Sequence, residues 1–482
     1  MLMKTCPYCK NPIEEFWSYC RNCNKPLIAN LEDALDRNVR FTYGEPEIFH
    51  LDLEEESDAY DDIIIKDEEI DQKIKKIDST LESKEVLGEP IPGSLLLEKS
   101  SLYYRKRDIP EALKTLELAL TNFKEENDLS NIAICHNELG IIQEDNGFFD
   151  QAIYHFNRSL EILKDLNDTS KIVKVFNNLG NVYFLIKDIE QSYNYYQKAY
   201  QLSQQENFIF EEVKSSSNLV EVLYLLKDYD RIKGILTKNL DFFKDNEDVF
   251  GMIQTHIKFG KLYYMMGEDF SESLQHLTKA LELIELIKKN ITVYIKAKLE
   301  WECFLYLGKI YSLWDNLTKA ENLFLQSLEA VRIFEIGDNI KEGEILENLA
   351  ELYLSKGDID KSIEYYDLSC EIFYKFGDNR KNAELKFKIG KIILEFEEDT
   401  SKAINYIEEA LNIYEDLEYI KECAIIYHKL GDIYLHKGIT ERAISNFESA
   451  RDYYQKMQDD YSANLLNEKI KSLRNQTDIN IL

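Results

Sequence analysis

A short motif recurs along the chain at a step close to 40 residues, and it constrains the fold more than any other feature. The motif is clearest as Asn178 to Tyr183, Phe259 to Tyr263, Leu307 to Tyr311 and Leu430 to Tyr434, where a tyrosine lies three residues after a glycine. We call this glycine site the signature position. It falls at 100, 140, 180, 220, 260, 308, 350, 390 and 431, with Ser, Val and Ala replacing glycine at 100, 220 and 350. Such a period is typical of stacked supersecondary units rather than of one large core.

Small side chains recur at two fixed distances after each signature position. Two helices approach within about 8–10 Å only where small residues line the contact, so the pattern predicts paired helices. Glycines seven residues after a signature position, at 147, 267, 357 and 438, are placed where a left-handed residue would end the first helix of a pair. The two small series are Ala112, Ala152, Ser192, Ser273, Ala320, Ser362, Ala403 and Ala443, then Ala119, Ser159, Ala199, Ala280, Ser327, Ser369, Ala410 and Ala450.

Each repeat is therefore predicted to be a helical hairpin. About nine hairpins would fill residues 93–460, and an apolar stripe that includes Leu465, Leu466, Ile470 and Leu473 predicts a capping helix and tail over 461–482. All seven prolines lie at or before Pro110, which leaves the rest of the chain free to form helices. The repeat centred on Val220 departs most from the pattern, with Ile232 and Asn239 at the small positions.

Four of the eight cysteines form two C-x-x-C pairs near the start of the chain: Cys6 with Cys9, and Cys20 with Cys23. Each pair can direct two thiolates at one ion, and two pairs complete a closed tetrahedral zinc site. A redox pair or chance spacing is the alternative reading. Residues 1–28 resemble a short zinc ribbon, which predicts one structural Zn2+ and no open coordination position for catalysis.

Residues 29–92 are predicted to be an acidic, mostly disordered linker. Between Glu45 and Glu69, twelve carboxylates accompany one lysine, so this stretch repels itself and buries little apolar surface. Residues 60–86 could still form a transient helix.

Net charge and motifs narrow the class of function. A formal charge of −31 argues against a nucleic-acid partner, and no apolar run is long enough to cross a membrane or to form a signal peptide, so we expect a cytoplasmic protein. The sequence holds no H-E-x-x-H, G-x-S-x-G or complete P-loop motif, so no catalytic or cofactor-binding residues are assigned and no enzyme is expected.

Residues 94–460 resemble the tetratricopeptide repeat, whose signature is a glycine, a tyrosine three residues later, and small residues at twelve and nineteen. The 40-residue step looks most like the long repeats of Pins-type polarity adaptors and kinesin light chains. The resemblance implies an all-α, right-handed superhelical solenoid whose concave groove binds peptide segments of other proteins. The residues two before and one after the signature positions from 180 onward are implied to point into that groove. Glu221, Tyr306, Glu351 and Asp432 are among them, and the peptide-binding candidates are Asn178, Asn181, Asn218, Lys258, Lys261, Lys309, Asn348, Lys388, Lys391 and Lys429.

The lysines in this set suggest a moderately basic strip over repeats five to nine, suited to an acidic peptide. A solvated face without ligand preference is the alternative. Lys388 and Lys391 have Glu384 and Glu395 four residues away, whereas Lys258, Lys261 and Lys309 have no acid at helical spacing. The sequence therefore favours a non-enzymatic scaffold or adaptor. A ligand-responsive regulator of signalling or transcription, autoinhibited by the acidic linker, is the runner-up, and the oligomeric state is left open.

Overall fold

The computed structural model describes residues 67–267, 270–289, 291–334, 340–396 and 399–479. Throughout these ranges the regular elements are helices, which confirms the all-α prediction. The ribbon that would hold Cys6, Cys9, Cys20 and Cys23 lies outside the described residues, so the zinc site stays a prediction. The helices are α2 (Asp67–Leu87), α3 (Gly93–Arg105), α4 (Ile109–Glu126), α5 (Leu129–Asp145), α6 (Phe149–Leu166), α7 (Thr169–Leu185), α8 (Ile189–Glu206), α9 (Ile209–Leu226), α10 (Tyr229–Asp245), α11 (Val249–Met266), α12 (Phe270–Ile287), α13 (Val293–Leu313), α14 (Leu317–Phe334), α15 (Ile340–Ser355), α16 (Ile359–Lys375), α17 (Asn379–Phe396), α18 (Thr400–Asp416), α19 (Ile420–His436), α20 (Thr440–Lys456) and α21 (Asp460–Ile479).

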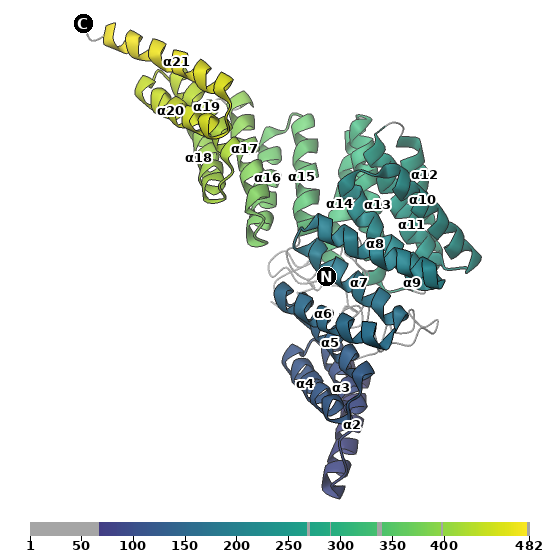
Figure 1. Cartoon of the computed structure of the whole chain (residues 1–482). Coiled ribbons are helices and arrows are strands. Elements are labelled where there is room, and N and C mark those ends of the chain that lie inside the picture. Colours follow the sequence, from purple (N-terminus) through teal and green to yellow (C-terminus); the bar gives the residue numbers. More distant parts are fainter. Residues whose placement is uncertain (1–66, 268–269, 290, 335–339, 397–398, 480–482) are drawn as a thin grey trace, which may run out of the picture. The chain divides into compact units, whose positions relative to one another are not determined.

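Helices α3 to α20 form nine consecutive pairs, which we call A and B helices, with the signature position on each A helix. The chain divides into two compact units, Met1–Tyr306 and Leu307–Leu482, and α13 spans the division. Within each unit, neighbouring helices pack in chain order as a solenoid does (Figure 1). The right-handed superhelical twist stays a prediction.

Turn chemistry sets the length of the helices. The residue seven after the signature position adopts a left-handed conformation in every repeat where it is described, whether it is Gly147 (φ 77°) or Lys187 (φ 64°). An aspartate commonly follows and caps the next helix, as when the Asp188 carboxylate accepts a hydrogen bond from the Gln191 backbone N–H at 3.1 Å. The predicted C-cap glycines are confirmed, and non-glycine residues adopt the same conformation elsewhere.

Close helix contact explains the signature glycine. A methyl group at Gly180 would lie 2.5 Å from the Tyr196 ring, and one at Gly431 would lie 2.4 Å from the Phe447 ring. The residue that fills this space comes sixteen positions later. Where one residue is inserted it comes seventeen positions later and is aliphatic: Leu277 lies against Gly260, and Ile407 lies against Gly390. Side chains larger than glycine would separate the paired helices here.

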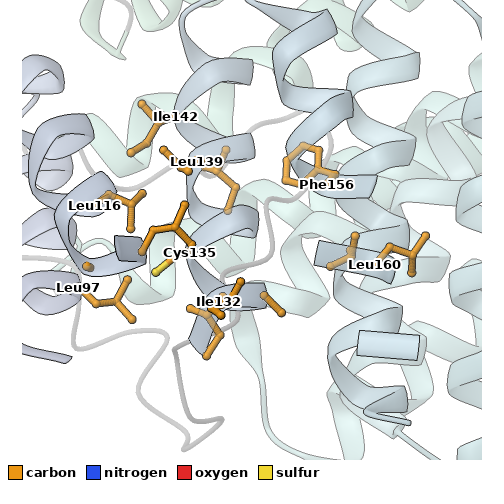
Figure 2. Packing of buried hydrophobic residues seen from close by; sticks show 14 of the residues in the cluster. Leu97, Leu116, Ile132, Cys135, Leu139, Ile142, Phe156 and Leu160 are labelled. Atoms are coloured by element: carbon orange, nitrogen blue, oxygen red, sulfur yellow. The ribbon is translucent and has the colours of Figure 1, made fainter. Parts of the chain in front are cut away.

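The buried interior is a series of clusters strung along the repeats. Figure 2 shows part of the first cluster, where Leu97, Leu116, Cys135 and Phe156 come from four successive helices, α3 to α6. The four scattered cysteines at 135, 303, 370 and 423 are all buried, as expected of small core residues. In the divergent fourth repeat, Asn239 is buried, and its amide donates to the Ser216 hydroxyl at 2.9 Å.

Within the predicted linker, where a transient helix was expected over residues 60–86, residues 67–87 form a packed helix, α2. Ile70, Ile74 and Ile77 lie one turn apart and are buried against Leu102 of α3. The acidic composition hid this apolar stripe, which is enough to dock the helix. Residues 29–66 lie outside the described part of the chain.

At the other end of the array, α21 packs on α20, with Leu466, Ile470 and Leu473 in the C-terminal core cluster. Leu465, predicted for the same stripe, is instead 52% exposed. In the described residues, no helix combines the length and apolarity needed to cross a membrane.

Candidate peptide-binding face

The ten residues predicted to line a groove all lie on A helices, at what we call inner-face positions: two before and one after the signature position. The structure gives them different environments in the two units. In unit 1 they lie on α7, α9 and α11. In unit 2 the corresponding helices are α13, whose Lys309 follows the division, and then α15, α17 and α19.

In unit 1 the predicted asparagines are buried and hydrogen-bonded, Asn178 and Asn218 to neighbouring repeats and Asn181 within its own. The Asn178 amide donates to Asn137 Oδ1 at 3.0 Å, and the Asn218 amide lies 3.4 Å from Asn177 Oδ1. Asn181 Oδ1 accepts from the Tyr196 hydroxyl at 2.9 Å. Asn178 and Asn218 therefore join one A helix to the next, and Asn181 joins α7 to its own B helix, α8.

Asn137 and Asn177 complete this asparagine network, and sequence reasoning missed them. Both lie three residues before a signature position, one place from the positions that the resemblance selected. Asn177 also donates to the Ser215 hydroxyl at 2.8 Å. The recurrence of asparagine three residues before two successive signature positions is the sequence signal that could have predicted this network.

The lysines of unit 1 surround a buried carboxylate. Lys258 Nζ lies 3.1 Å from one Glu221 oxygen, and Lys261 Nζ lies 3.4 Å from the other. Lys261 also lies 3.9 Å from Glu302 and 4.5 Å from the centre of the Tyr224 ring. Glu221 is 7% exposed, so the cluster is a buried ion-pair network across α9, α11 and α13.

The electrostatics of this network keep it charged. Burial alone would raise the pKa of Glu221, but Lys261 and Lys258 lower it to about 2. Burial alone would lower the pKa of Lys261, but Glu221 and its other neighbours hold it well above the usual value. Each charge is stabilised by its partners, and removing one would leave the others buried and uncompensated.

Unit 2 also pairs its inner-face lysines, in more exposed surroundings. Lys309 Nζ lies 2.8 Å from Glu344, and Lys388 Nζ lies 2.5 Å from Glu351, which is exposed. Asn348 is half-buried, and its amide donates to the Glu344 backbone carbonyl at 2.7 Å. These pairs join adjacent A helices at the surface.

Lys391 and Lys429 are the remaining predicted residues, and both are exposed. Lys391 Nζ lies 4.9 Å from the centre of the Phe387 ring. Within the described ranges, no carboxylate forms an ion pair with either lysine.

The predicted basic strip therefore needs a correction. Lys258, Lys261 and Lys309 do have acidic partners, but these lie 35 to 41 residues away on neighbouring repeats: Glu221, Glu302 and Glu344. Lys388 pairs with Glu351 rather than with Glu384. The prediction took account only of acids on the same helix. Acids on neighbouring helices neutralise the strip, except at Lys391 and Lys429.

Two histidine pairs recur at equivalent places in repeats two and five. Nδ1 of His136 lies 3.0 Å from Nδ1 of His155, and Nδ1 of His256 lies 2.9 Å from Nδ1 of His276. Burial, and then the neighbouring histidine, lower the pKa of His136 and of His256 to about 4. The two pairs lie between the A and B helices of their repeats, α5 with α6 and α11 with α12.

The sequence matches three family profiles. Residues 173–206 and 341–416 match tetratricopeptide repeat profiles, and residues 394–479 match the soluble NSF attachment protein family. The TPR repeat-containing protein MJ1428 of Methanocaldococcus jannaschii is 25% identical over 194 residues, 39% of this chain and 30% of that protein. These matches support a tetratricopeptide repeat protein.

One solved structure shares the fold. The apo form of the quorum sensor NprR from B. thuringiensis overlaps 76% of this chain and 97% of its own, with a TM-score of 0.51 and 15% identity. A Rap protein complexed with competence and sporulation factor overlaps 73% of this chain and 99% of its own, with a TM-score of 0.47 and 17% identity. The NprR likeness concerns the fold alone.

Proposed function

We propose that this chain is a non-enzymatic scaffold that binds peptide segments of partner proteins on the inner face of its A helices. The observation that carries the proposal is the row of polar and charged side chains on α15, α17 and α19. Asn348, Glu351, Lys388, Lys391 and Lys429 occupy equivalent positions there, and all are half-buried or exposed. Other residues of the same helices, such as Ile389, Ile393 and Leu430, belong to the core clusters.

This row suits an extended or helical peptide. Amide, ammonium and carboxylate groups can bond main-chain carbonyl and N–H groups, and the periodic A helices repeat those groups at regular intervals. Rigid helices also hold the side chains in place before a partner arrives, which reduces the entropy cost of binding. The asparagines of unit 1, which we expected to act in the same way, are buried and already bonded, so the proposal rests on unit 2.

The test is a selection of random displayed peptides against the full chain, with the affinities of the enriched peptides measured by calorimetry. A double variant, Asn348→Ala with Lys388→Ala, should weaken these peptides by about tenfold. The matched control is Lys361→Ala with Lys375→Ala on the B helix α16, which should leave the affinity unchanged. Failure to enrich any peptide, or equal loss in both variants, would contradict the proposal.

A ligand-responsive regulator is the second candidate. Its support is the fold shared with NprR, which is described as a quorum sensor, and at this identity the likeness extends no further than the fold. A titration of duplex DNA with the full chain at physiological salt separates a scaffold from a DNA-binding regulator, because an acidic scaffold should not bind DNA.

Masking of the inner face by the acidic segment stays a prediction. Replacing the carboxylates from Glu45 to Asp62 by amides should raise the affinity for a selected peptide, and an unchanged affinity would exclude masking.

The N-terminal zinc ribbon is a separate proposal that rests on the spacing of Cys6, Cys9, Cys20 and Cys23. Four thiolates complete the coordination of one Zn2+, so the ion would stabilise a segment too short to form a core of its own. Metal analysis of the purified chain should find one zinc per chain, and Cys20→Ala should lose it. An unchanged zinc content in that variant would exclude the site.

A further inference from the structure

Three of the inner-face ion pairs share one geometry, and one junction between repeats places two like charges at the same two positions. In these pairs, the residue that follows the signature position of one repeat pairs with the residue two places before the signature position of the next repeat. Glu221 meets Lys258 in this way at 3.1 Å, Glu351 meets Lys388 at 2.5 Å, and Asp432 meets Lys469 of α21 at 2.6 Å. The two partners are 37 residues apart in each case.

Between repeats eight and nine the same two positions hold Lys391 and Lys429. Ala383 and Phe387 of α17 belong to the same core cluster as Leu430 of α19. Two ammonium groups thus lie where the flanking repeats place an ammonium and a carboxylate. Neither forms an ion pair within the described part of the chain.

Glu395, four residues after Lys391, is exposed, and within the described residues it forms no ion pair with that lysine. Asp432, one turn after Lys429, is held by Lys469, and Glu351 on the other side is held by Lys388. An exposed aliphatic side chain lies beside the pair, since Ile425 is 42% exposed one turn before Lys429. The site therefore combines two uncompensated positive charges with a small apolar surface.

We infer that Lys391 and Lys429 form an anion-binding point for an acidic peptide segment of a partner protein, in which a carboxylate lies next to an aliphatic residue. This inference rests on the proposed function and names the chemistry of its ligand. A carboxylate between the two ammonium groups would supply the negative charge that Glu351 and Asp432 supply in the neighbouring repeats. The aliphatic residue would cover Ile425.

The probe is a fluorescein-labelled peptide of alternating Glu and Leu, with a peptide of alternating Gln and Leu as the uncharged control. Anisotropy titrations of the full chain should show binding of the Glu peptide that weakens with salt, and much weaker binding of the Gln peptide. Lys391→Gln with Lys429→Gln should lower the affinity about tenfold. The matched control, Lys421→Gln with Lys471→Gln, removes two exposed charges elsewhere on α19 and α21 and should leave it unchanged.

A second variant separates binding from folding. Lys391→Glu recreates the pair seen at Glu351 and Lys388, so it should abolish probe binding and leave the midpoint of thermal unfolding no lower than in the unmodified chain. Equal binding by the Lys391→Gln, Lys429→Gln variant would overturn the inference. Selected peptides that bind the chain while the Glu peptide does not would overturn it too, but would leave the proposed function standing.

The chain's own acidic segment is the other possible source of carboxylates. If the Glu peptide binds only after the carboxylates from Glu45 to Asp62 are replaced by amides, the site is occupied from within the chain. That result would overturn the assignment to an external partner.

Discussion

The inner faces of the two units use equivalent repeat positions for different purposes. In unit 1, Asn178 and Asn218 are buried and tie successive A helices together, and Glu221 holds two lysines in a buried network. In unit 2, Asn348 and Lys388 are half-buried, and Lys391 and Lys429 are exposed. A signature position thus identifies where a side chain lies on its helix, but burial decides whether that side chain holds the array together or is available to a partner.

The largest contrast is expected for the two inner-face glutamates. Glu221→Gln leaves Lys258 and Lys261 without their shared charge partner and should cost about 3 kcal/mol or more, because a buried pair is broken. Glu351→Gln removes an exposed pair and should cost less than about 1 kcal/mol. Urea unfolding followed by circular dichroism measures both. Similar losses in the two variants would remove the distinction between the units.

A smaller difference is expected for the asparagines. Asn178→Ala leaves Asn137 without its hydrogen-bond donor in a buried place and should cost about 1–3 kcal/mol. Asn348→Ala, at the half-buried equivalent position, should cost under about 1 kcal/mol. Hydrogen exchange of α5 and α7, compared with that of α15 and α17, would locate each effect. If Asn348→Ala speeds exchange at α15 and α17 more than Asn178→Ala speeds it at α5 and α7, the structural role belongs to Asn348 and not to Asn178.

The contact between the signature glycine and the ring on the paired helix, by contrast, should behave alike in both units. Gly180→Ala and Gly431→Ala each place a methyl group against an aromatic ring at 2.5 and 2.4 Å. Each should cost about 1–3 kcal/mol from overpacking, partly offset by up to about 1 kcal/mol from the higher helix propensity of alanine. Midpoints of thermal unfolding that fall by similar amounts would show that the units differ at the inner face and not in their hairpins. A loss confined to one unit would contradict this.

The smallest expected effect concerns pH, and it sharpens the comparison because both histidine pairs lie in unit 1. Burial and the partner histidine lower the pKa of His136 and of His256 to about 4, below the ordinary value of 6.5. Between pH 6.5 and 4 the unfolded chain therefore binds more protons than the folded chain, so stability should fall as the pH falls through this range.

The charged groups near the pairs are Lys124, Arg158, Lys244, Lys279 and Glu272, and four of these five oppose protonation. Breaking both pairs with His136→Asn and His256→Asn should reduce the pH dependence of thermal unfolding between pH 6.5 and 4, and His155 and His276, whose pKa values burial also lowers, should keep part of it. The exposed His436→Asn is the control and should leave that dependence unchanged. An equal pH dependence in all three chains would exclude the pairs as its source.

Much of the fold was predictable because hairpin packing depends on local periodicity. The signature glycines, the small residues that follow them and the left-handed turn residues all recur at fixed intervals, and the structure places them as expected. The docking of α2 was missed because its acidic composition outweighed a short isoleucine stripe. The partners of the inner-face lysines were missed for another reason: Glu221, Glu302 and Glu344 lie a whole repeat away, beyond any helix-surface spacing. Burial of Asn178 was not encoded in its own repeat either, since it depends on Asn137 in the repeat before.

The central claim is that a peptide partner binds the inner face of unit 2, while the same face of unit 1 is committed to structure. Hydrogen–deuterium exchange of the full chain, with and without a saturating selected peptide, tests it most directly. We predict new protection in α15, α17 and α19 and none in α5, α7 and α9. Protection confined to α7 and α9, with α17 and α19 unchanged, would contradict the account.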